Sequence, residues 1–260
     1  MFYQIIIFAI PYLYPVHFYI PIQPMSTPHP LQEYYSRIYK SYDLVNSLFT
    51  FGLDKKWRKH TVQACLSTQP GQILDLCCGT GDLALGLAQA AAPGTTITGY
   101  DLNPDMLKIA RQKAAGITGP GIDFIRGDVA AMPFADHEFD CITIGFGFRN
   151  LTWQNPGSEK HLSEMSRVLK PGGRLLILES ADPENRIIGF FYRIYLRIIL
   201  VPLGGLLSGD WRAYRYLAGS SAGFYGIASL QSMMNKHRLH LSPVRKYLFG
   251  SVNLLIAFKK

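Results

Sequence analysis

The sequence predicts a doubly wound α/β fold, in which a mostly parallel sheet is covered by helices on both faces. Short apolar segments alternate along the chain with helix-forming segments of about 10–15 residues, a pattern that gives parallel strands joined by right-handed helical crossovers. The chain has 260 residues, of which 48% are apolar, and this is enough to bury a large core. These values exclude a disordered tail protein.

The body of the chain begins with helices and continues as alternating strands and helices. Apolar residues recur at helical spacing over residues 33–66, with a break at Gly52 and a second helix from Asp54. The expected strands are residues 72–77, 96–100, 122–126, 141–144 and 174–179, and the expected helices between them are residues 82–92, 104–115 and 158–169. Because the strands alternate with helices, we expect the sheet to be buried on both faces.

The last part of the chain departs from this alternation. Residues 187–207 are strongly apolar and are expected to form a helix that Pro202 kinks or ends, because proline removes a helical hydrogen bond. Residues 246–258 can supply the one or two strands that close the sheet. We therefore expect a single domain over residues 33–260, in which residues 187–240 form a helical lid and substrate region, inserted before the final strands.

The N-terminal segment has no charged side chain over residues 1–24. A secretory signal is not expected, because a basic n-region and a small-residue cleavage site are both missing. A membrane-spanning helix is not expected either, because Pro11, Pro15 and Pro21 each remove a helical hydrogen bond. Two interpretations stay open: residues 1–32 form an apolar arm that touches a membrane, or Met25 is the true start of the protein.

The net charge of +8 is distributed unevenly. Residues 1–185 carry 15 basic and 17 acidic side chains, whereas residues 186–260 carry 11 basic side chains and a single acidic one, Asp210. A basic excess confined to one part of the chain indicates contact with an anionic surface or ligand. Nucleic acid is not the expected partner, because the sequence shows no recognition helix, zinc module or aromatic-basic stripe.

The cysteines indicate a reducing compartment and no metal site. The four of them, Cys65, Cys77, Cys78 and Cys141, show no spacing typical of a disulfide framework. The adjacent pair has no His or second Cys pair nearby and would make a poor metal ligand set.

A glycine-rich loop follows the first expected strand and opens the next helix. Gly79 and Gly81 let the backbone turn sharply and approach a ligand closely, at conformations that a side chain would forbid. Asp101 ends the second strand, where a carboxylate can accept hydrogen bonds from both hydroxyls of a ribose. The pattern Gly79-x-Gly81-x-x-Ala84 also satisfies a dinucleotide motif, so an NAD-dependent enzyme stays open at this point.

Three further features favour S-adenosyl-L-methionine over a dinucleotide. Asp75 lies at the end of the first strand and can engage the positively charged methionine end of that cofactor, whereas an anionic pyrophosphate would gain nothing from it. Asp128 and Val129 follow the third strand and offer a carboxylate for the adenine amino group and an apolar contact for its ring. Residues 169–174, Leu-Lys-Pro-Gly-Gly-Arg, form a helix end and a tight turn that are common in class I methyltransferases.

Six stretches between Tyr42 and about Leu217 are similar to one known family. They are YDLVNSLFTFGLDKKWRK (42–59), DLCCGTGDLA (75–84), GYDLNPDML (99–107), GDVAAMPFADHEFDCITIGFGFRNL (127–151), EMSRVLKPGGRLLILES (164–180) and AYRYLAGS (213–220). They resemble the quinone C-methyltransferases of menaquinone, ubiquinone and phylloquinone biosynthesis. The phrase Phe146-Gly-Phe-Arg-Asn150 is the most specific of these matches, because general methyltransferases lack it.

This resemblance implies C-methylation of a reduced prenylated quinone ring, with S-adenosyl-L-methionine as the methyl donor. Demethylmenaquinol is the expected substrate, and 2-methoxy-6-polyprenyl-benzoquinol of ubiquinone biosynthesis is the alternative, followed by another small aromatic. Together with the carry-over from the family, the expected cofactor-binding residues are Asp75, Gly79, Thr80, Gly81, Asp101, Leu102, Asp128, Val129 and Gly145.

The chemistry is expected at Arg149 and Asn150, which follow the fourth strand at the carboxyl edge where open α/β sheets bind ligands. A hydroquinone that loses a phenolic proton gains electron density on the neighbouring ring carbon. Arg149 cannot be the base, because arginine stays protonated, but it can stabilise the phenolate and orient a water while Asn150 fixes the ring oxygen. The candidates for the substrate wall are Tyr42, Asp43, Tyr214 and Tyr216. Tyrosines at such spacing are also frequent core residues.

A prenylated quinol resides in a bilayer, so we expect a cytoplasmic protein that binds an anionic membrane surface peripherally. Residues 187–207 and their basic surroundings combine apolar area with positive charge, as interfacial binding requires. A helical lid that is simply buried over the sheet is the alternative. The sequence leaves the oligomeric state open, a homodimer included.

Overall fold

The computed structural model describes residues 35–260 except residues 38, 40–41 and 118. The predictions made for residues 1–32 therefore lie outside the described residues. The side chain of Tyr42 lies outside them as well, although its backbone begins the helix α2 (Tyr42–Phe49).

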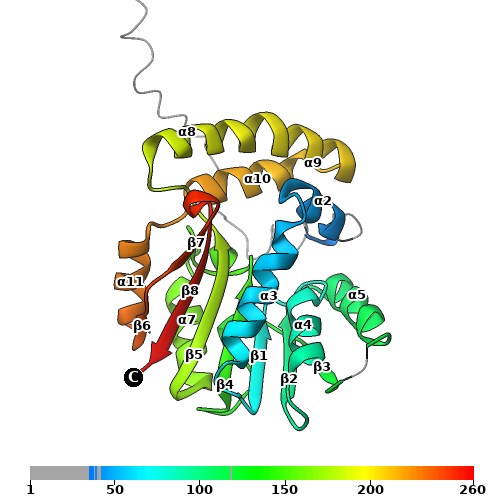
Figure 1. Cartoon of the computed structure of the whole chain (residues 1–260), viewed down its shortest axis with the longest axis vertical. Coiled ribbons are helices and arrows are strands. Elements are labelled where there is room, and N and C mark those ends of the chain that lie inside the picture. The colour runs from blue at the N-terminus through cyan, green and yellow to red at the C-terminus, as the bar shows by residue number, and fades with distance from the viewer. Residues whose placement is uncertain (1–34, 38, 40–41, 118) are drawn as a thin grey trace, which may run out of the picture.

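A central eight-stranded sheet organises the described chain (Figure 1). Its strands are β1 (Gln72–Leu76), β2 (Thr96–Asp101), β3 (Ile122–Arg126), β4 (Phe139–Gly145), β5 (Leu169–Ser180), β6 (Leu239–Leu241), β7 (Arg245–Tyr247) and β8 (Val252–Lys259). They are ordered β3-β2-β1-β4-β5-β8-β6, with β7 also paired to β8. The strands β1 to β5 run parallel and β8 is antiparallel, which confirms the predicted fold class.

Helices cover both faces of this sheet. On one face lie α3 (Leu53–Leu66), α4 (Asp82–Ala90) and α5 (Pro104–Ala114), and on the other lie α6 (Phe148–Thr152), α7 (Ser158–Val168) and α11 (Ile227–Asn235). Successive residues of β5 alternate between the two layers: Leu175 and Ile177 pack with α7, while Leu176 and Leu178 pack with α3 and α4. This two-sided burial explains why the strands are continuous apolar runs.

A third layer lies above the carboxyl edge of the parallel strands (Figure 1). We call it the helical cap; it consists of α8 (Arg186–Tyr195), the π-helical turn η3 (Leu196–Leu200), α9 (Val201–Ser208) and α10 (Trp211–Ala222). Its inner residues Leu196, Leu200 and Tyr214 form a buried cluster with Val45 of α2. The cap therefore has a small core of its own and rests on the edge where the strand-end loops meet.

Of the two outcomes expected at Pro202, a kink or an end, the helix does not end there but runs on from Arg186 to Ser208, with its α-helical pattern interrupted just before the proline. A π-helical turn precedes the proline, and in it the Val201 N–H bonds to the Leu196 carbonyl five residues back. Such a turn shifts the hydrogen-bond register and makes room for a ring that an unbroken α-helix would not accept. By length and composition alone, Arg186–Ser208 could also cross a membrane.

Candidate active site

The glycine loop lies between β1 and α4 and holds three residues in the left-handed backbone region. These are Cys77 (φ 52°), Gly79 (φ 55°) and Gly81 (φ 84°). A Cβ on Gly81 would lie 2.9 Å from the Cβ of Ala110, so only glycine lets the loop pass this close to α5. The loop turns back sharply and faces the end of β2.

Asp101, at the end of β2, is bonded to this loop. Its carboxylate accepts hydrogen bonds from the Gly79 N–H at 2.9 Å and from the Asn103 N–H at 2.8 Å. Burial raises the pKa of Asp101. The structure thus brings together Gly79 and Asp101, which the sequence placed on separate strand ends.

Asp75 lies beneath the loop, in the centre of the sheet, and is fully buried. One carboxylate oxygen accepts a hydrogen bond from the Thr143 hydroxyl at 2.7 Å, and the other has no hydrogen-bond partner among the described residues. Burial raises the pKa of Asp75 to about 7, in spite of the hydrogen bond from Thr143. An orphaned acceptor of this kind suits a ligand that brings a positive charge or a hydrogen-bond donor.

Arg58 of α3 reaches the same region and was not singled out by the sequence. Its Nε atom lies 3.7 Å from Asp54 and 4.0 Å from Asp82, and its guanidinium stacks 5.3 Å from the centre of the Phe146 ring. Its Nη1 atom would be 3.4 Å from a Cβ on Gly145, the predicted cofactor residue at the end of β4. The Nε atom is buried and has no hydrogen-bond partner among the described residues.

Asp43, predicted for the substrate wall, instead lies beside the glycine loop. It accepts a hydrogen bond from the Thr80 hydroxyl at 2.7 Å and pairs with Lys113 at 2.6 Å. Lys113 also bonds to Asp82 at 2.7 Å, at the start of α4. Thr80 is therefore held in place by a charged network that links α2, α4 and α5.

The end of β3 carries the residues predicted to contact adenine. The Asp128 carboxylate caps the next turn by accepting the Ala130 N–H at 2.9 Å, and the side chain is about half exposed (51%). Val129 is buried beside it. Leu102 is half-buried at the neighbouring end of β2, where its carbonyl accepts a hydrogen bond from Arg126 at 3.3 Å.

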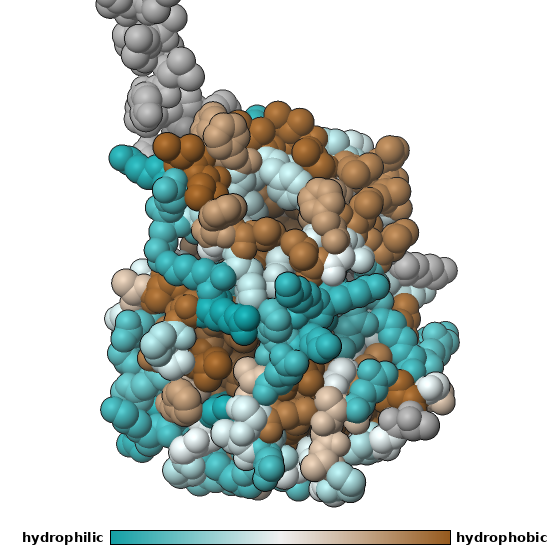
Figure 2. All heavy atoms as spheres, in the orientation of Figure 1, coloured by the Kyte–Doolittle hydropathy of each residue, from teal (hydrophilic) through white to brown (hydrophobic). Residues whose placement is uncertain are grey.

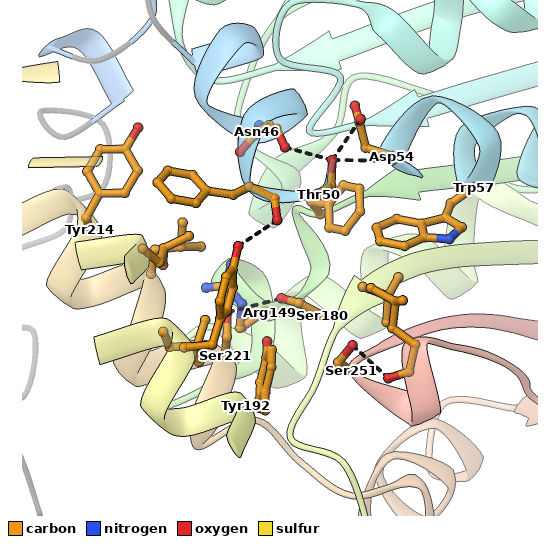
Figure 3. Close-up of a pocket in the computed structure, with 18 of the residues that line it drawn as sticks. Asn46, Thr50, Asp54, Trp57, Arg149, Ser180, Tyr192, Tyr214, Ser221 and Ser251 are labelled. Carbon is orange, nitrogen blue, oxygen red and sulfur yellow. Dashed lines mark hydrogen bonds between the residues drawn. The ribbon is translucent and has the colours of Figure 1, made fainter. Parts of the chain in front are cut away.

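A cavity of about 310 Å³ lies between the sheet edge and the helical cap (Figure 3). Nine of its lining residues are aromatic, and its charged side chains are Arg149 and Asp54. The lining residues are Tyr35, Asn46, Phe49, Thr50, Phe51, Asp54, Trp57, Phe146, Arg149, Ser180, Tyr192, Tyr195, Leu196, Leu200, Ala213, Tyr214, Tyr216, Leu217, Ser221, Leu248, Ser251 and Val252. Aromatic walls around a few polar groups are typical of a small-molecule site.

Arg149 is the buried cation of this cavity, with 1% of its surface exposed. Its Nε atom lies 3.6 Å from Glu179, which is equally buried and also accepts the Arg149 backbone N–H at 3.0 Å. Its Nη1 atom donates to the hydroxyl of Ser220 in α10. Burial is the largest single effect and lowers the pKa of Arg149, but the Glu179 carboxylate and the neighbouring tyrosines together outweigh it. The net pKa is raised, so the guanidinium stays charged. From the sequence, Glu179 was expected only as the last residue of a strand, with no role in the site.

Asn150 joins Arg149 to two tyrosines. Its amide donates to the Tyr35 hydroxyl at 2.8 Å, and its side-chain oxygen accepts from the Tyr216 hydroxyl at 3.3 Å. Tyr214 lines the cavity nearby, and burial raises its pKa to about 12. The structure thus assembles Arg149, Tyr214 and Tyr216 around one cavity, with Asn150 bonded at its edge.

Comparison with known proteins gives a consistent assignment. Residues 25–259 match the model of the ubiE/COQ5 methyltransferase family. The chain is 46% identical to a demethylmenaquinone methyltransferase of Thermus thermophilus, over 77% of this chain and 88% of that protein. It is 40% identical to one of Deinococcus radiodurans, over 88% and 92% of the two chains.

Solved structures with low sequence identity share the fold. One is a SAM-dependent methyltransferase of Thermotoga maritima, with 18% identity and a TM-score of 0.60, covering 88% of this chain and 99% of that one. Another is a SAM-dependent methyltransferase of Aquifex aeolicus, with 16% identity and a TM-score of 0.53, over 73% and 82% of the two chains.

We predict that Asp75 makes the unliganded protein less stable as the pH rises. Because the pKa of Asp75 is raised from 3.8 to about 7, the folded state keeps a proton that the unfolded state loses. The contribution of the Asp75 carboxyl to the free energy of unfolding is fully present at low pH and is lost progressively as the pH rises to about 7. Asp75→Asn mimics the neutral acid. Its free energy of unfolding, relative to that of the wild type, should therefore rise by roughly 2–4 kcal/mol between low pH and about pH 7. Urea unfolding across this pH range measures the difference, and a constant difference would contradict the prediction.

Proposed function

Because the chain belongs to the ubiE/COQ5 methyltransferase family and uses S-adenosylmethionine, we propose that it methylates a ring carbon of a reduced demethylmenaquinone. The relatives named demethylmenaquinone methyltransferase favour this naphthoquinol over the benzoquinol of ubiquinone biosynthesis. The observation that carries the proposal is the buried Arg149 in an aromatic cavity, one strand away from the glycine loop. Such a cavity suits a flat ring that develops negative charge.

The residues at the carboxyl edge fit the cofactor along its whole length. Asp101 would hold the ribose, and Asp128 and Val129 would hold the adenine. The orphaned oxygen of Asp75 fits the ammonium of the methionine part, and Arg58 fits its carboxylate. When bound there, S-adenosylmethionine supplies a methyl group on a sulfonium.

Arg149 supports the nucleophile. The quinol must lose a phenolic proton to a water before its ring carbon is reactive, and the fixed guanidinium stabilises the resulting phenolate. Glu179 at Nε and Ser220 at Nη1 hold the guanidinium in place, so little reorganisation is needed when the phenolate forms. The role assigned to Arg149 is therefore electrostatic, because its raised pKa excludes proton acceptance.

The ring is oriented by groups around the cation. Asn150, bonded to Tyr35 and Tyr216, has a fixed side-chain direction and can bond to a ring oxygen. Trp57, Phe146 and Tyr192 offer flat apolar surfaces on other sides of the cavity. These walls also exclude water, which strengthens the attraction between Arg149 and a phenolate.

The outer face of the helical cap offers a surface for a lipid bilayer. Apolar side chains gather over the upper part of the molecule, whereas the lower part is mostly polar (Figure 2). The helix Arg186–Ser208 of the cap exposes a set of large apolar residues, namely Ile187, Phe190, Phe191, Ile194, Ile198, Ile199, Leu203, Leu206 and Leu207. Because the inner face packs on α10 and α2, we place this helix in the interface plane as a peripheral anchor of a cytoplasmic protein.

Some basic side chains of residues 186–260 are engaged in contacts within the protein. Arg193 pairs with Asp182, and Lys246 pairs with Glu184. The Lys259 ammonium donates to two backbone carbonyls and is buried. Attraction to anionic lipid therefore depends on exposed residues of the cap such as Arg186, Arg212 and Arg215.

We predict that the protein methylates demethylmenaquinol under reducing conditions and not the oxidised quinone. Arg149→Gln should lower kcat about 100-fold or more, because the phenolate loses its cation. That variant also leaves the buried Glu179 unpaired, so the double variant with Glu179→Gln serves as a folding control. A folded variant that turns over at the wild-type rate would remove Arg149 from the mechanism.

We predict that Arg58 recognises only the amino-acid end of the cofactor. Arg58→Gln should weaken the binding of S-adenosylhomocysteine about 10–100-fold, because a charge-assisted hydrogen bond is lost, and leave 5′-methylthioadenosine unaffected. Asp101→Asn should weaken both ligands, because both contain the ribose. The matched control is Lys59→Gln, the exposed neighbour on α3. Calorimetry measures all three, and an equal loss of both ligands in Arg58→Gln would contradict the assignment.

We predict that the protein floats with liposomes and does so more strongly when anionic lipid is present. Ile198→Asp should reduce flotation at least tenfold, because a carboxylate would enter the apolar interface. Phe258→Asp is the control, since Phe258 is exposed near the C-terminal end of β8, which lies away from the helical cap (Figure 1). Flotation that ignores both lipid charge and Ile198→Asp would mean that the cap is only a buried lid.

A further inference from the structure

The mouth of the cavity can be located from exposure. Of the residues that line the cavity, only Phe51, with 83% of its surface exposed, and Leu248, with 47%, are exposed; the others are buried or half-buried. Phe51 lies in the turn between α2 and α3, and Leu248 lies in the short turn η4 (Leu248–Gly250) between β7 and β8. Two apolar side chains from distant parts of the sequence therefore mark the opening.

Both turns hold these side chains in a backbone conformation that bulky residues avoid. Phe51 has φ 52°, Leu248 has φ 43° and its neighbour Phe249 has φ 58°. Glycine would adopt these angles without strain. Strained positions of this kind persist where the surrounding structure requires them, and they cluster at ligand clamps. Here they keep large apolar side chains at the mouth, where water would otherwise favour polar ones.

The apolar surface continues outward from the mouth. Phe249 is 78% exposed beside Leu248, and Leu48 and Leu44 are exposed on the helix that ends next to Phe51. α2 packs against the helical cap through Val45, so its exposed leucines adjoin the apolar cap. An apolar path thus leads from the cavity through the mouth to the proposed membrane face.

The cavity is too small for a whole prenylated quinol. A volume of about 310 Å³ is at the low end for small-molecule pockets and suits a ring system near Arg149. A long isoprenoid chain attached to that ring must leave the cavity. A chain that left elsewhere would have to displace buried side chains of the wall.

Building on the proposed function, we infer that the isoprenoid chain of the substrate leaves the cavity between Phe51 and Leu248. The first isoprene units contact Phe51, Leu248 and Phe249, and the rest of the chain stays in the bilayer that the outer face of the helical cap contacts. The mouth therefore recognises the chain, while Arg149 recognises the ring. The cavity opens toward the lipid that carries the substrate.

The test compares quinols with one and with several isoprene units, in detergent micelles. Phe51→Asn and Leu248→Asn replace the apolar side chains with a residue that tolerates positive φ, so that folding is retained. We expect the ratio of kcat/KM for the long chain to that for the short chain to fall about tenfold in each variant. Phe258→Asn, at an exposed phenylalanine near the C-terminal end of β8, should leave the ratio unchanged.

A second measurement does not depend on turnover. A quinol analogue with a photoreactive group on its second isoprene unit should label Phe51, Leu248 or Phe249, as mapped by mass spectrometry. Labelling of other cavity residues alone, or an unchanged chain-length ratio in both Asn variants, would overturn the inference while turnover of the short quinol still supports the proposed function. Failure of the wild type to methylate either quinol would instead refute the proposed function.

Discussion

The buried ion pair between Arg149 and Glu179 is the interaction on which the rest of the site depends. Arg149 follows β4 in α6, Glu179 lies near the end of the adjacent strand β5, and each is almost completely removed from water. A charge placed alone in such surroundings costs several kcal/mol, so the guanidinium can face an apolar cavity only because the carboxylate lies beside it. Ser220 adds a hydrogen bond from α10, which ties the helical cap to the same cation. Arg149 therefore connects the edge of the sheet, the helical cap and the cavity.

A similar constraint shapes the cofactor side, where opposite charges are buried near each other without full pairing. Asp75 keeps one oxygen without a partner among the described residues, and Arg58 lies no closer than 3.7 Å to any carboxylate oxygen with which it is paired. Incomplete pairing of buried charges is costly, and a ligand that carries both an ammonium and a carboxylate would relieve that cost. The raised pKa of Asp75 is the sign of this cost, because the group avoids the charge until a cation arrives.

Much of the fold and part of the site could be predicted from the sequence, and the exceptions share a physical cause. The parallel strands and the glycine loop were predictable because periodicity and loop chemistry are local. Arg149 and Asn150 were singled out because they belong to the phrase Phe146-Gly-Phe-Arg-Asn150. Arg58 and Glu179 were missed because their meaning depends on contacts between distant segments, α3 with the end of β4 and β5 with α6. At Pro202 the sequence left a kink and a helix end both open, and it did not predict the π-helical turn that lets the helix continue.

The helical cap explains why an apolar helix can lie on the outside of this protein. Gly204 and Gly205 are buried against the rings of Tyr214 and Trp211, which any larger side chain would strike, so α9 lies close on α10. Close packing of small residues on the inner side leaves the large apolar side chains of the helix on the outer side. In water that outer face would expose more apolar surface than a soluble protein normally carries in one patch. In the proposed function a bilayer would cover this face, and the same bilayer would hold the prenylated substrate. Under that proposal one helix has two roles, because the helix that covers the cavity with its inner face would contact the lipid with its outer face.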